Sequence, residues 1–416
     1  MTRREFLKTG TAIECILAAG TYSLFPANVC AKIPANLAVT ALKVIPVFNG
    51  SYTWIFVKIF TSEGITGIGE GGIRGKEGTM IAAIQEHERY LVGKNPLEIE
   101  KHWQAMFRWA RWRGGPILNT AISAVEMALW DIAGKVMDAP VYQLLGGAAR
   151  EKIRIYIHGG GTTPQEAAEA IHRAKEFGFT ALKTAPRVAR NSVVHQPWDV
   201  NYEISLIKAM RDAAGNDFDI LIDAHTMLTP VMALEYALRL EELRPFFLEE
   251  PVEWEDLDTL AWLSNKVKIP LAMGERQFTK FGFKEMIDRH LVSYVQPDVK
   301  HAGGISECKK IAAMAEAHFI DTALHNDQSP VMTLASLHID ACTPNCVIQE
   351  FPLHKYEPWM EELFGGVHIK YSNGFAELPA GPGLGIDINE EEAKKHPYQP
   401  VNREMWEWED GSVADL

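Results

Sequence analysis

The chain has few cysteines, and their spacing excludes a zinc ribbon, a redox dithiol motif and a disulfide-stapled fold. There are five in 416 residues, without a CxxC pair. We interpret them as isolated core thiols. Cys342 and Cys346 are close enough in the sequence to pair, and the sequence alone leaves that question open.

An excess of positive charge and long apolar runs are also missing. The net charge is −13, which argues against nucleic acid or an anionic membrane as a partner. Outside the N-terminal segment, no stretch approaches the roughly 18 uninterrupted apolar residues of a membrane-spanning helix. The composition, 47% hydrophobic and 23% charged, is that of a soluble globular protein. An anionic substrate would be mildly repelled, so its site must carry a local positive charge.

The N-terminus has the pattern of an export signal. Residues 2–8 contain an arginine pair and are similar to the twin-arginine signal of bacteria. A mostly apolar stretch, residues 11–25, follows, and residues 29–31 resemble a cleavage site, although Glu14 interrupts the apolar stretch. We expect residues 1–31 to be a signal segment and the mature protein to be periplasmic; without a working signal it would be cytoplasmic.

Residues 39–150 have the pattern of an α+β domain. Residues 54–60 are β-branched and aromatic, a turn follows at 61–64, and residues 65–70 form another strand-like run. Helical periodicity then takes over and is strongest over residues 120–137. We therefore predict three strands followed by helices in this domain.

After Arg150, short strand-like runs alternate with helical segments. That alternation predicts parallel strands connected by helices, and eight such units form a (β/α)8-type barrel. We place the barrel at residues 151–355 and a Gly/Pro-rich C-terminal segment, expected to pack back on the N-terminal domain, at 356–416. The loop after the second strand, which contains residues 191–201, is unusually long. The predicted strands are residues 153–157, 181–183, 219–223, 246–249, 271–274, 292–296, 321–325 and 346–350.

Acidic residues and one histidine recur at nearly constant intervals. Steps of 26, 26, 23, 27 and 25 residues separate Asp223, Glu249, Glu275, Asp298, His325 and Glu350. Most of them directly follow a short apolar run, at the end of a predicted strand, so they should meet at the carboxyl-end face of the barrel, where the active sites of such barrels lie. Three carboxylates converging there would repel one another without a cation between them. The pattern therefore predicts a metal site at the mouth of the barrel.

Several motifs in this chain resemble those of a known family. They are the run at residues 119–135, Leu248-Glu249-Glu250-Pro251, Gly274-Glu275-Arg276, Gln296-Pro297-Asp298 and Ala302-Gly303-Gly304-Ile305. By these motifs the chain resembles the enolase superfamily, in its mandelate racemase subgroup, and is most similar to galactonate-dehydratase-type sugar-acid dehydratases. The resemblance covers nearly everything from about residue 40 onward. It implies an α/β fold, a modified TIM barrel with an N-terminal α+β capping domain.

The resemblance implies that Asp223, Glu249 and Glu275 bind Mg²⁺, one ligand from each of three successive strands. Such a set suits a hard cation that prefers carboxylate oxygens. Of the adjacent residues Glu249 and Glu250, the position in the motif favours Glu249. Neighbouring strand residues face opposite sides, so at most one of the two easily reaches the barrel axis.

Two histidines are the candidates for acid and base. His225 lies two residues after Asp223, so both side chains can face the same side of the strand end. His325 ends the seventh strand, next to Asp298 at the end of the sixth, and an Asp–His pair makes a usable general base near neutral pH. Three other histidines have no such partner and are interpreted as structural or peripheral: His158, His195 and His301.

Lys183 and Glu350 are the candidates for contact with the substrate. Many racemases of the subgroup carry Lys-x-Lys at the end of the second strand, but here Lys183 is followed by Thr184 and Ala185. That departure argues against two-base racemisation through this strand and leaves Lys183 to neutralise a substrate carboxylate. Glu350 would hydrogen-bond the substrate carboxylate, and it would need to be protonated to donate.

We predict a Mg²⁺-dependent lyase that removes water from a sugar acid, either an aldonate or an aldarate. His325, oriented by Asp298, would take the proton on C2, and His225 would protonate the departing 3-hydroxyl, giving a 2-keto-3-deoxy acid. We expect substrate specificity to depend on three loops: residues 48–54, residues 71–78 and the long loop after the second strand. Three alternatives stay open: a racemase or epimerase with the two histidines as opposed bases, a lactonising enzyme, and a non-catalytic sugar-acid binding protein. We expect a homo-oligomer.

Overall fold

A computed structural model of the chain describes residues 34–109, 111–186, 193–194, 200–352, 357–401 and 405–413. The expected signal segment and most of the long loop at 191–201 lie outside these ranges, so the export prediction stays a prediction. The oligomeric state and the domain limits given above likewise stay predictions. Across the described ranges, no helix is both long enough and apolar enough to cross a membrane.

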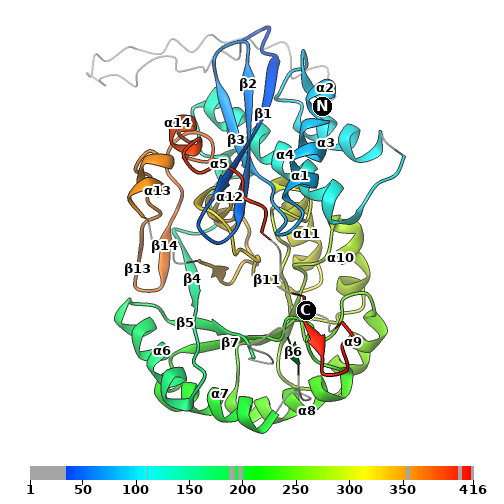
Figure 1. Cartoon of the computed structure of the whole chain (residues 1–416), viewed down its shortest axis with the longest axis vertical. Helices are drawn as coiled ribbons and strands as arrows, with labels where there is room; N and C mark the ends of the chain where they lie inside the picture. The colour runs from blue at the N-terminus through cyan, green and yellow to red at the C-terminus, as the bar shows by residue number, and fades with distance from the viewer. Residues whose placement is uncertain are drawn as a thin grey trace, which may run out of the picture. The chain divides into compact units, whose positions relative to one another are not determined.

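The N-terminal domain begins with a three-stranded antiparallel sheet in the order β1-β2-β3 (Figure 1). Its strands are β1 (Val39–Phe48), β2 (Thr53–Thr61) and β3 (Thr66–Glu70). The central strand, β2, is β-branched and aromatic and is buried along nearly its whole length. Asn49 shapes the β1–β2 turn, because its side-chain oxygen accepts from the backbone N–H groups of Ser51 and Tyr52, each at 2.9 Å.

The helix α4 (Gly115–Met137) packs directly on this sheet. Contact is so close that a Cβ at Gly67 or Gly69 would lie 2.0 Å from a backbone oxygen of α4, so only glycine fits at these two positions. The helix begins five residues before the predicted start at 120, and a proline in its first turn favours that start. The other helices of this domain are α1 (Glu77–Gln85), α2 (Glu88–Leu91), α3 (Ile99–Arg108) and α5 (Val141–Leu144).

The second part of the chain contains the predicted series of parallel strands. Each strand pairs with the next in sequence order, apart from β6, from β4 through to β11. The last strand of this parallel series, β12, pairs with β4. A parallel bridge between Thr322 and Cys346 links the end of β11 to the residues that precede β12. The strands are β4 (Lys152–His158), β5 (Ala181–Thr184), β7 (Asp219–Asp223), β8 (Phe247–Glu249), β9 (Leu271–Met273), β10 (Tyr294–Val295), β11 (Asp321–Thr322) and β12 (Gln349–Glu350).

The last two strands are shorter than the predicted runs at 321–325 and 346–350. Beyond these two short strands, side chains make hydrogen bonds that backbone groups would make if the strands were longer. The Gln349 amide donates to the carbonyl of Leu324 at 3.0 Å, and the backbone N–H of Asn326 donates to the Glu350 carboxylate at 2.7 Å. His325 therefore lies in a loop beyond β11, not within a strand.

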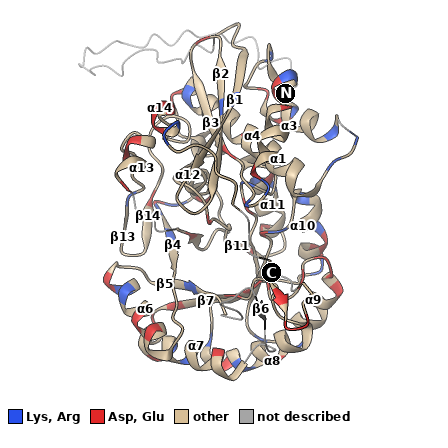
Figure 2. Cartoon of the chain, viewed as in Figure 1, with Lys and Arg blue, Asp and Glu red and all other residues tan. Residues whose placement is uncertain are grey.

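Helices flank the parallel strands, and several begin at a capping side chain. Thr163, Thr229 and Ser329 each accept a backbone N–H at the start of a helix that has proline in its first turn. Figure 1 shows α6, α7 and α8 on the outer side of β5 and β7, and Figure 2 shows charges of both signs interspersed along these helices. The helices are α6 (Pro164–Glu176), α7 (Val200–Ala214), α8 (Pro230–Leu240), α9 (Leu257–Ser264), α10 (Thr279–Asp288), α11 (Ile305–Glu316) and α12 (Pro330–Ala341), with a short 3-10 helix, η1 (Glu241–Leu243), after α8.

The C-terminal residues contact both parts of the fold. The hairpin of β13 (Tyr371–Ser372) and β14 (Phe375–Glu377) adds to β4 in antiparallel fashion. Near α14, Asp387 pairs with Lys58 of β2 at 3.1 Å. The remaining elements are α13 (Pro358–Leu363), α14 (Glu390–Ala393), and β15 (Glu407–Trp408), which pairs in parallel with β6 (Val193–Val194).

The cysteines within the described residues are not paired. Cys308, Cys342 and Cys346 are free and buried. The Cys346 thiol donates to the buried carboxylate of Asp340 at 3.0 Å. These three cysteines are therefore core thiols, as interpreted from the sequence. Cys342 and Cys346 do not form a disulfide with each other.

Glu126 of α4 joins the two domains by capping a helix of the barrel. Its carboxylate accepts the backbone N–H groups of Ile305 and Ser306, each at 2.8 Å, at the start of α11, whose N-cap residue Gly304 has no side chain to do so. Trp130 Nε1 donates to the same carboxylate at 2.8 Å. Burial raises the pKa of this fully buried carboxyl to about 7.

We expect Glu126→Ala to lower the free energy of unfolding by about 1–3 kcal/mol, because it leaves buried N–H donors without an acceptor. Glu126→Gln should cost less, since its amide oxygen still accepts. Denaturant unfolding of both variants measures this, with Glu176→Ala on the exposed face of α6 as the control. A loss in Glu126→Ala no larger than in the control would contradict the capping role.

Candidate active site

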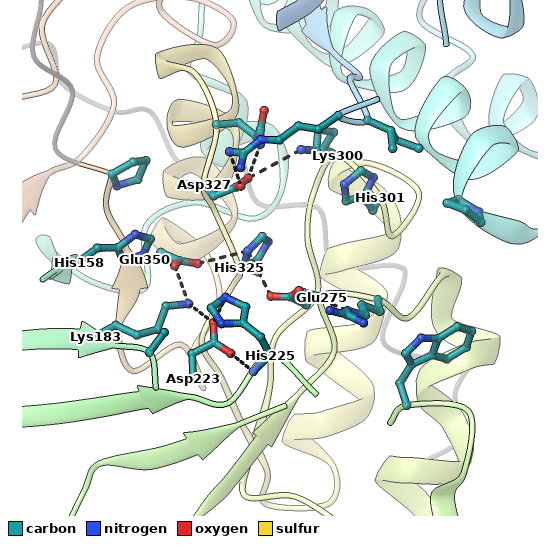
Figure 3. A pocket seen from close by; sticks show the side chains of 18 of the residues that line it. His158, Lys183, Asp223, His225, Glu275, Lys300, His301, His325, Asp327 and Glu350 are labelled. Atoms are coloured by element: carbon teal, nitrogen blue, oxygen red, sulfur yellow. Dashed lines mark hydrogen bonds and ion pairs between the residues drawn. The ribbon is translucent and has the colours of Figure 1, made fainter. Parts of the chain in front are cut away.

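One cavity of about 1260 Å³ lies at the carboxyl ends of the parallel strands (Figure 3). Its wall is formed by residues that end or follow each of the eight parallel strands, together with residues 72–74 and 115–116 of the N-terminal domain. Six of the eight predicted site residues line it; Glu249 and Asp298 are fully buried behind the wall. The cavity thus has the position of the active site in a (β/α)8-type barrel.

Three carboxylates come together at this cavity. Asp223 ends β7, Glu249 ends β8 and Glu275 follows β9, and each offers an oxygen within 4.8 Å of the other two. Asp223 and Glu249 are buried, whereas the Glu275 side chain is 15% exposed at the cavity surface. Burial and repulsion by Asp223 raise the pKa of Glu249 to about 8.

Lys183 lies among these acids, with a side chain only 6% exposed. Its ammonium is 2.6 Å from Glu350 Oε1, 2.9 Å from Glu249 Oε1 and 3.5 Å from Asp223 Oδ2. Burial opposes its charge, but Glu249 and Glu350 hold its pKa well above the usual value. In the structure the charge of Lys183 is directed to the protein's own carboxylates, and its expected contact with a substrate carboxylate stays a prediction.

The donor set of the cluster fits a hard divalent cation. Asp223, Glu249 and Glu275 offer only carboxylate oxygens, which Mg²⁺ prefers, and the partly exposed Glu275 leaves the cluster open to the cavity. Lys183 supplies one positive charge against these three acids and Glu350. Burial and the repulsion that remains among these acids raise the pKa of Glu249, and a bound cation would allow Glu249 to ionise.

Glu250 is a structural residue and not part of the cluster. It is fully buried, and its Oε1 accepts the backbone N–H of Gly274 at 3.0 Å. Burial and the nearby charge of Glu275 raise its pKa well above the usual value, so it is protonated. The choice of Glu249 over Glu250 for the cluster agrees with these positions.

His325 and Asp298 form the predicted pair. Nδ1 of His325 is 2.8 Å from Asp298 Oδ2, and Asp298 is fully buried. The second oxygen of Asp298 accepts the backbone N–H of Lys300 at 2.7 Å, which fixes the carboxylate. Burial opposes a positive charge on His325, but Glu275, Glu350 and Asp298 raise its pKa well above the usual value, so His325 is strongly basic. Its Nε2 lies 3.3 Å from Glu275 Oε2, at the edge of the carboxylate cluster.

His225 shares the same cavity but is held differently. Its Nε2 is 2.9 Å from Asp223 Oδ2, and its backbone N–H donates to Asp223 Oδ1, also at 2.9 Å. Burial opposes its charge, but Asp223 raises the pKa of His225 above the usual value and favours the protonated form. His225 and Thr226 have φ angles of 50° and 57°, a strained left-handed backbone of the kind found at functional sites.

The structure shows the partners of Glu350 and corrects the interpretation of His158. Glu350 Oε1 contacts both Lys183 Nζ and His158 Nε2, and its Oε2 accepts the backbone N–H of Asn326 at 2.7 Å. Although burial opposes ionisation, Lys183 and His325 hold the pKa of Glu350 well below the usual range, which favours the ionised form. Its expected contact with the substrate stays a prediction. His158, interpreted as peripheral, lines the cavity at the end of β4.

His301, also interpreted as structural or peripheral, belongs to the cavity wall too. Its Nδ1 is 2.7 Å from the hydroxyl of Thr120 on α4, and burial lowers its pKa to about 4, which keeps it neutral. Lys300 and Asp327, which were not expected at the site, also line the cavity, as does Arg74 from the loop 71–78 that was expected to contact the substrate. A spacing signal was present, since Lys300 and Asp327 lie two residues after Asp298 and His325. His195 is outside the described residues.

Comparison with known proteins places the chain in a family. The model for the enolase C-terminal domain-like family matches residues 165–393, and that for the mandelate racemase/muconate lactonizing enzyme N-terminal domain matches residues 23–146. A D-galactonate dehydratase from Cronobacter sakazakii is 37% identical over 368 residues, which are 87% of this chain and 96% of that protein.

Solved structures agree with this placement. An enolase from Pantoea ananatis with bound D-gluconate and Mg has a TM-score of 0.84 at 32% identity, covering 91% of this chain and 100% of that one. A member of the enolase superfamily from Salmonella Typhimurium has a TM-score of 0.82 at 30% identity, covering 88% and 100%. The fold class predicted from the sequence is confirmed, and the chain belongs to the enolase superfamily, in its mandelate racemase/muconate lactonizing enzyme family.

Proposed function

We propose that the protein is a Mg²⁺-dependent dehydratase of a sugar acid, an aldonate or an aldarate, that forms a 2-keto-3-deoxy acid. One observation carries the proposal: two histidines, each hydrogen-bonded to a carboxylate, face one cavity beside the three-carboxylate cluster. The similarity to a D-galactonate dehydratase and to an enolase with bound D-gluconate and Mg supports the sugar-acid class.

The carboxylate cluster defines where the substrate's acid group would be held. Asp223, Glu249 and Glu275 would hold Mg²⁺, and the bound ion supplies a positive charge that polarises the substrate carboxylate and stabilises negative charge developing next to C2. The protein's own contribution there is to fix the three oxygens. Lys183, fully charged between Glu249 and Glu350, keeps this acidic wall from repelling an anionic substrate.

His325 is placed to act as the base on C2. Its Nδ1–H is directed to Asp298, and Nε2 lies 3.3 Å from Glu275 Oε2. A cation held by Glu275 would offset the negative charge that raises the pKa of His325 and would leave Nε2 free to accept a proton. Nε2 takes the C2 proton, and the electrons of the C–H bond move into the substrate carboxylate, which gives an enediolate. These electrons then return to form the C2–C3 double bond as the C3–O bond breaks. Asp298 then stabilises the imidazolium that results.

His225 is placed to act as the acid on the leaving group. Asp223 favours its protonated form, so it can donate a proton to the departing 3-hydroxyl, which leaves as water. The enol product takes a proton at C3 and loses the proton of its 2-hydroxyl, which gives the 2-keto-3-deoxy acid. At the end of the reaction His325 has gained a proton and His225 has lost one. Proton exchange with solvent returns both histidines to their starting states.

We expect turnover of sugar acids and no turnover of the corresponding neutral aldoses. The carboxylate is the group that the cluster and its cation would bind, and loss of one charge-stabilising contact of this kind costs at least about 10²-fold in rate. A screen of aldonic acids, aldaric acids and aldoses for 2-keto-acid formation measures this. The amide of the best aldonate is the matched neutral control, and equal rates on acid and amide would contradict the proposed binding mode.

A further inference from the structure

Lys300 is a buried cation for which the described residues supply no hydrogen-bond acceptor. It lines the cavity, its side chain is only 4% exposed, and in the part of the chain that the structure describes no hydrogen bond to its ammonium is found. Its ion-pair partner there is Asp327 Oδ1, at 3.9 Å, beyond hydrogen-bond reach. An ammonium has three donors, and leaving them unused in a buried place is costly. The donors of Lys300 therefore suit an oxygen brought by a ligand.

Asp327 is fixed beside Lys300 by a second cation. Arg74 of the N-terminal domain donates to Asp327 Oδ2 at 2.9 Å, and its guanidinium lies over the ring of Tyr52, 4.0 Å from the ring centre. The Tyr52 hydroxyl donates to the backbone carbonyl of Asp327 at 3.2 Å. The Gln328 amide also contacts Asp327 Oδ1. Burial opposes ionisation, but Lys300 and His325 hold the pKa of Asp327 well below its usual range, so it is an acceptor.

This polar group adjoins the proposed base. Lys300 and Asp327 each lie two residues beyond a member of the Asp298–His325 pair, and the backbone N–H of Lys300 donates to Asp298 Oδ1. Figure 3 shows Lys300 and Asp327 on one side of His325 and Asp223 on the other. A substrate held by its carboxylate at the cluster, with C2 at His325, would extend the rest of its carbon chain toward Lys300.

We propose that Lys300, Arg74 and Asp327 bind hydroxyl groups at the far end of the substrate chain and so select a long aldonate over a short one or a diacid. The proposal rests on the proposed dehydration of a sugar acid. A hydroxyl group both donates and accepts, and this site offers both partners: Lys300 donates and Asp327 accepts. A second carboxylate can only accept, and it would be repelled by the ionised Asp327.

Lys300→Met tests the donor. It keeps the length of the side chain and removes its charge. We expect kcat/KM for a six-carbon aldonate to fall about 10- to 100-fold, mainly through KM, which is the loss of one charged hydrogen bond. For a four-carbon aldonate, which is too short to reach the site, the fall should be much smaller. Lys310→Met on α11, outside the cavity, is the matched control and should leave the preference for the longer acid unchanged.

Asp327→Asn tests the exclusion of diacids. It keeps an acceptor oxygen but removes the negative charge, so we expect the rate on a six-carbon aldarate, relative to the matching aldonate, to rise about tenfold. Circular dichroism and thermal unfolding of both variants verify that they are folded.

The outcomes separate this proposal from the proposed function. If the wild-type enzyme dehydrates aldonates but Lys300→Met loses the same factor on the four-carbon and six-carbon acids, the far-end site is refuted and the dehydratase stands. A wild-type preference for aldarates that Lys300→Met abolishes would show a carboxylate site instead. Absence of wild-type activity on every sugar acid would refute both.

Discussion

His325→Asn is expected to abolish dehydration and also the exchange of the substrate's C2 proton with solvent. Asn keeps a hydrogen-bonding group next to Asp298 but has no basic nitrogen in place of Nε2, so the C2–H bond cannot be broken. Loss of a general base typically costs about 10²–10⁴-fold. Proton NMR in D₂O measures exchange, and an assay for 2-keto acid measures dehydration.

His225→Asn should separate the two activities. If His225 serves only as the acid, this variant loses dehydration of a hydroxyl substrate but retains measurable C2 exchange, since His325 is intact. A substrate whose 3-substituent leaves without protonation, such as fluoride, should partly restore elimination. His172→Asn, on the exposed face of α6, is the control for the substitution itself. The reversed pattern would exchange the two roles, and dehydration retained in both site variants would refute the mechanism.

Removal of divalent cations with a chelator should abolish activity, and Mg²⁺ or Mn²⁺ should restore it. Three carboxylates with oxygens within 4.8 Å of one another, two of them buried, need more positive charge than Lys183 provides. Glu275→Gln keeps the shape of the side chain and removes one charge, so we expect loss of tight metal binding in calorimetric titration.

The metal prediction has a matched control and a clear contradiction. Glu285→Gln on α10 changes an exposed glutamate outside the cavity and should leave both metal affinity and activity as in the wild type. Full activity of the metal-free protein would show that the carboxylate cluster is not a metal site. Undiminished Mg²⁺ affinity in Glu275→Gln would remove Glu275 from the ligand set.

Much of the fold was predictable because strand runs and helix periodicity repeat along the chain. The predicted strand at 219–223 coincides with β7, whose five residues are nearly all buried. Its last residue is Asp223, which lies at the strand end as expected. The prediction was less accurate at 321–325, because the hydrogen bonds that end β11 come from the side chain of Gln349 and the carboxylate of Glu350. Such contacts between distant residues leave no local signal.

The site was predictable where one residue per strand end carries the chemistry. Asp223 and Glu249 end neighbouring strands, so their meeting follows from strand order. The contacts of Lys183 with Glu249 and Glu350 could not be predicted from strand order, because they depend on distances across the barrel. The left-handed backbone of His225 has no sequence signal either, since histidine does not favour it as glycine does.

The most direct test of the account is proton NMR of the wild-type enzyme with Mg²⁺ and a six-carbon aldonate in D₂O. If His325 removes the C2 proton and His225 releases the 3-hydroxyl, the product is a 2-keto-3-deoxy acid that carries one deuterium at C3. Deuterium appearing at C2 of the sugar acid without loss of water would contradict dehydration and indicate an epimerase. An unchanged substrate across the aldonates and aldarates, with binding retained, would contradict catalysis altogether.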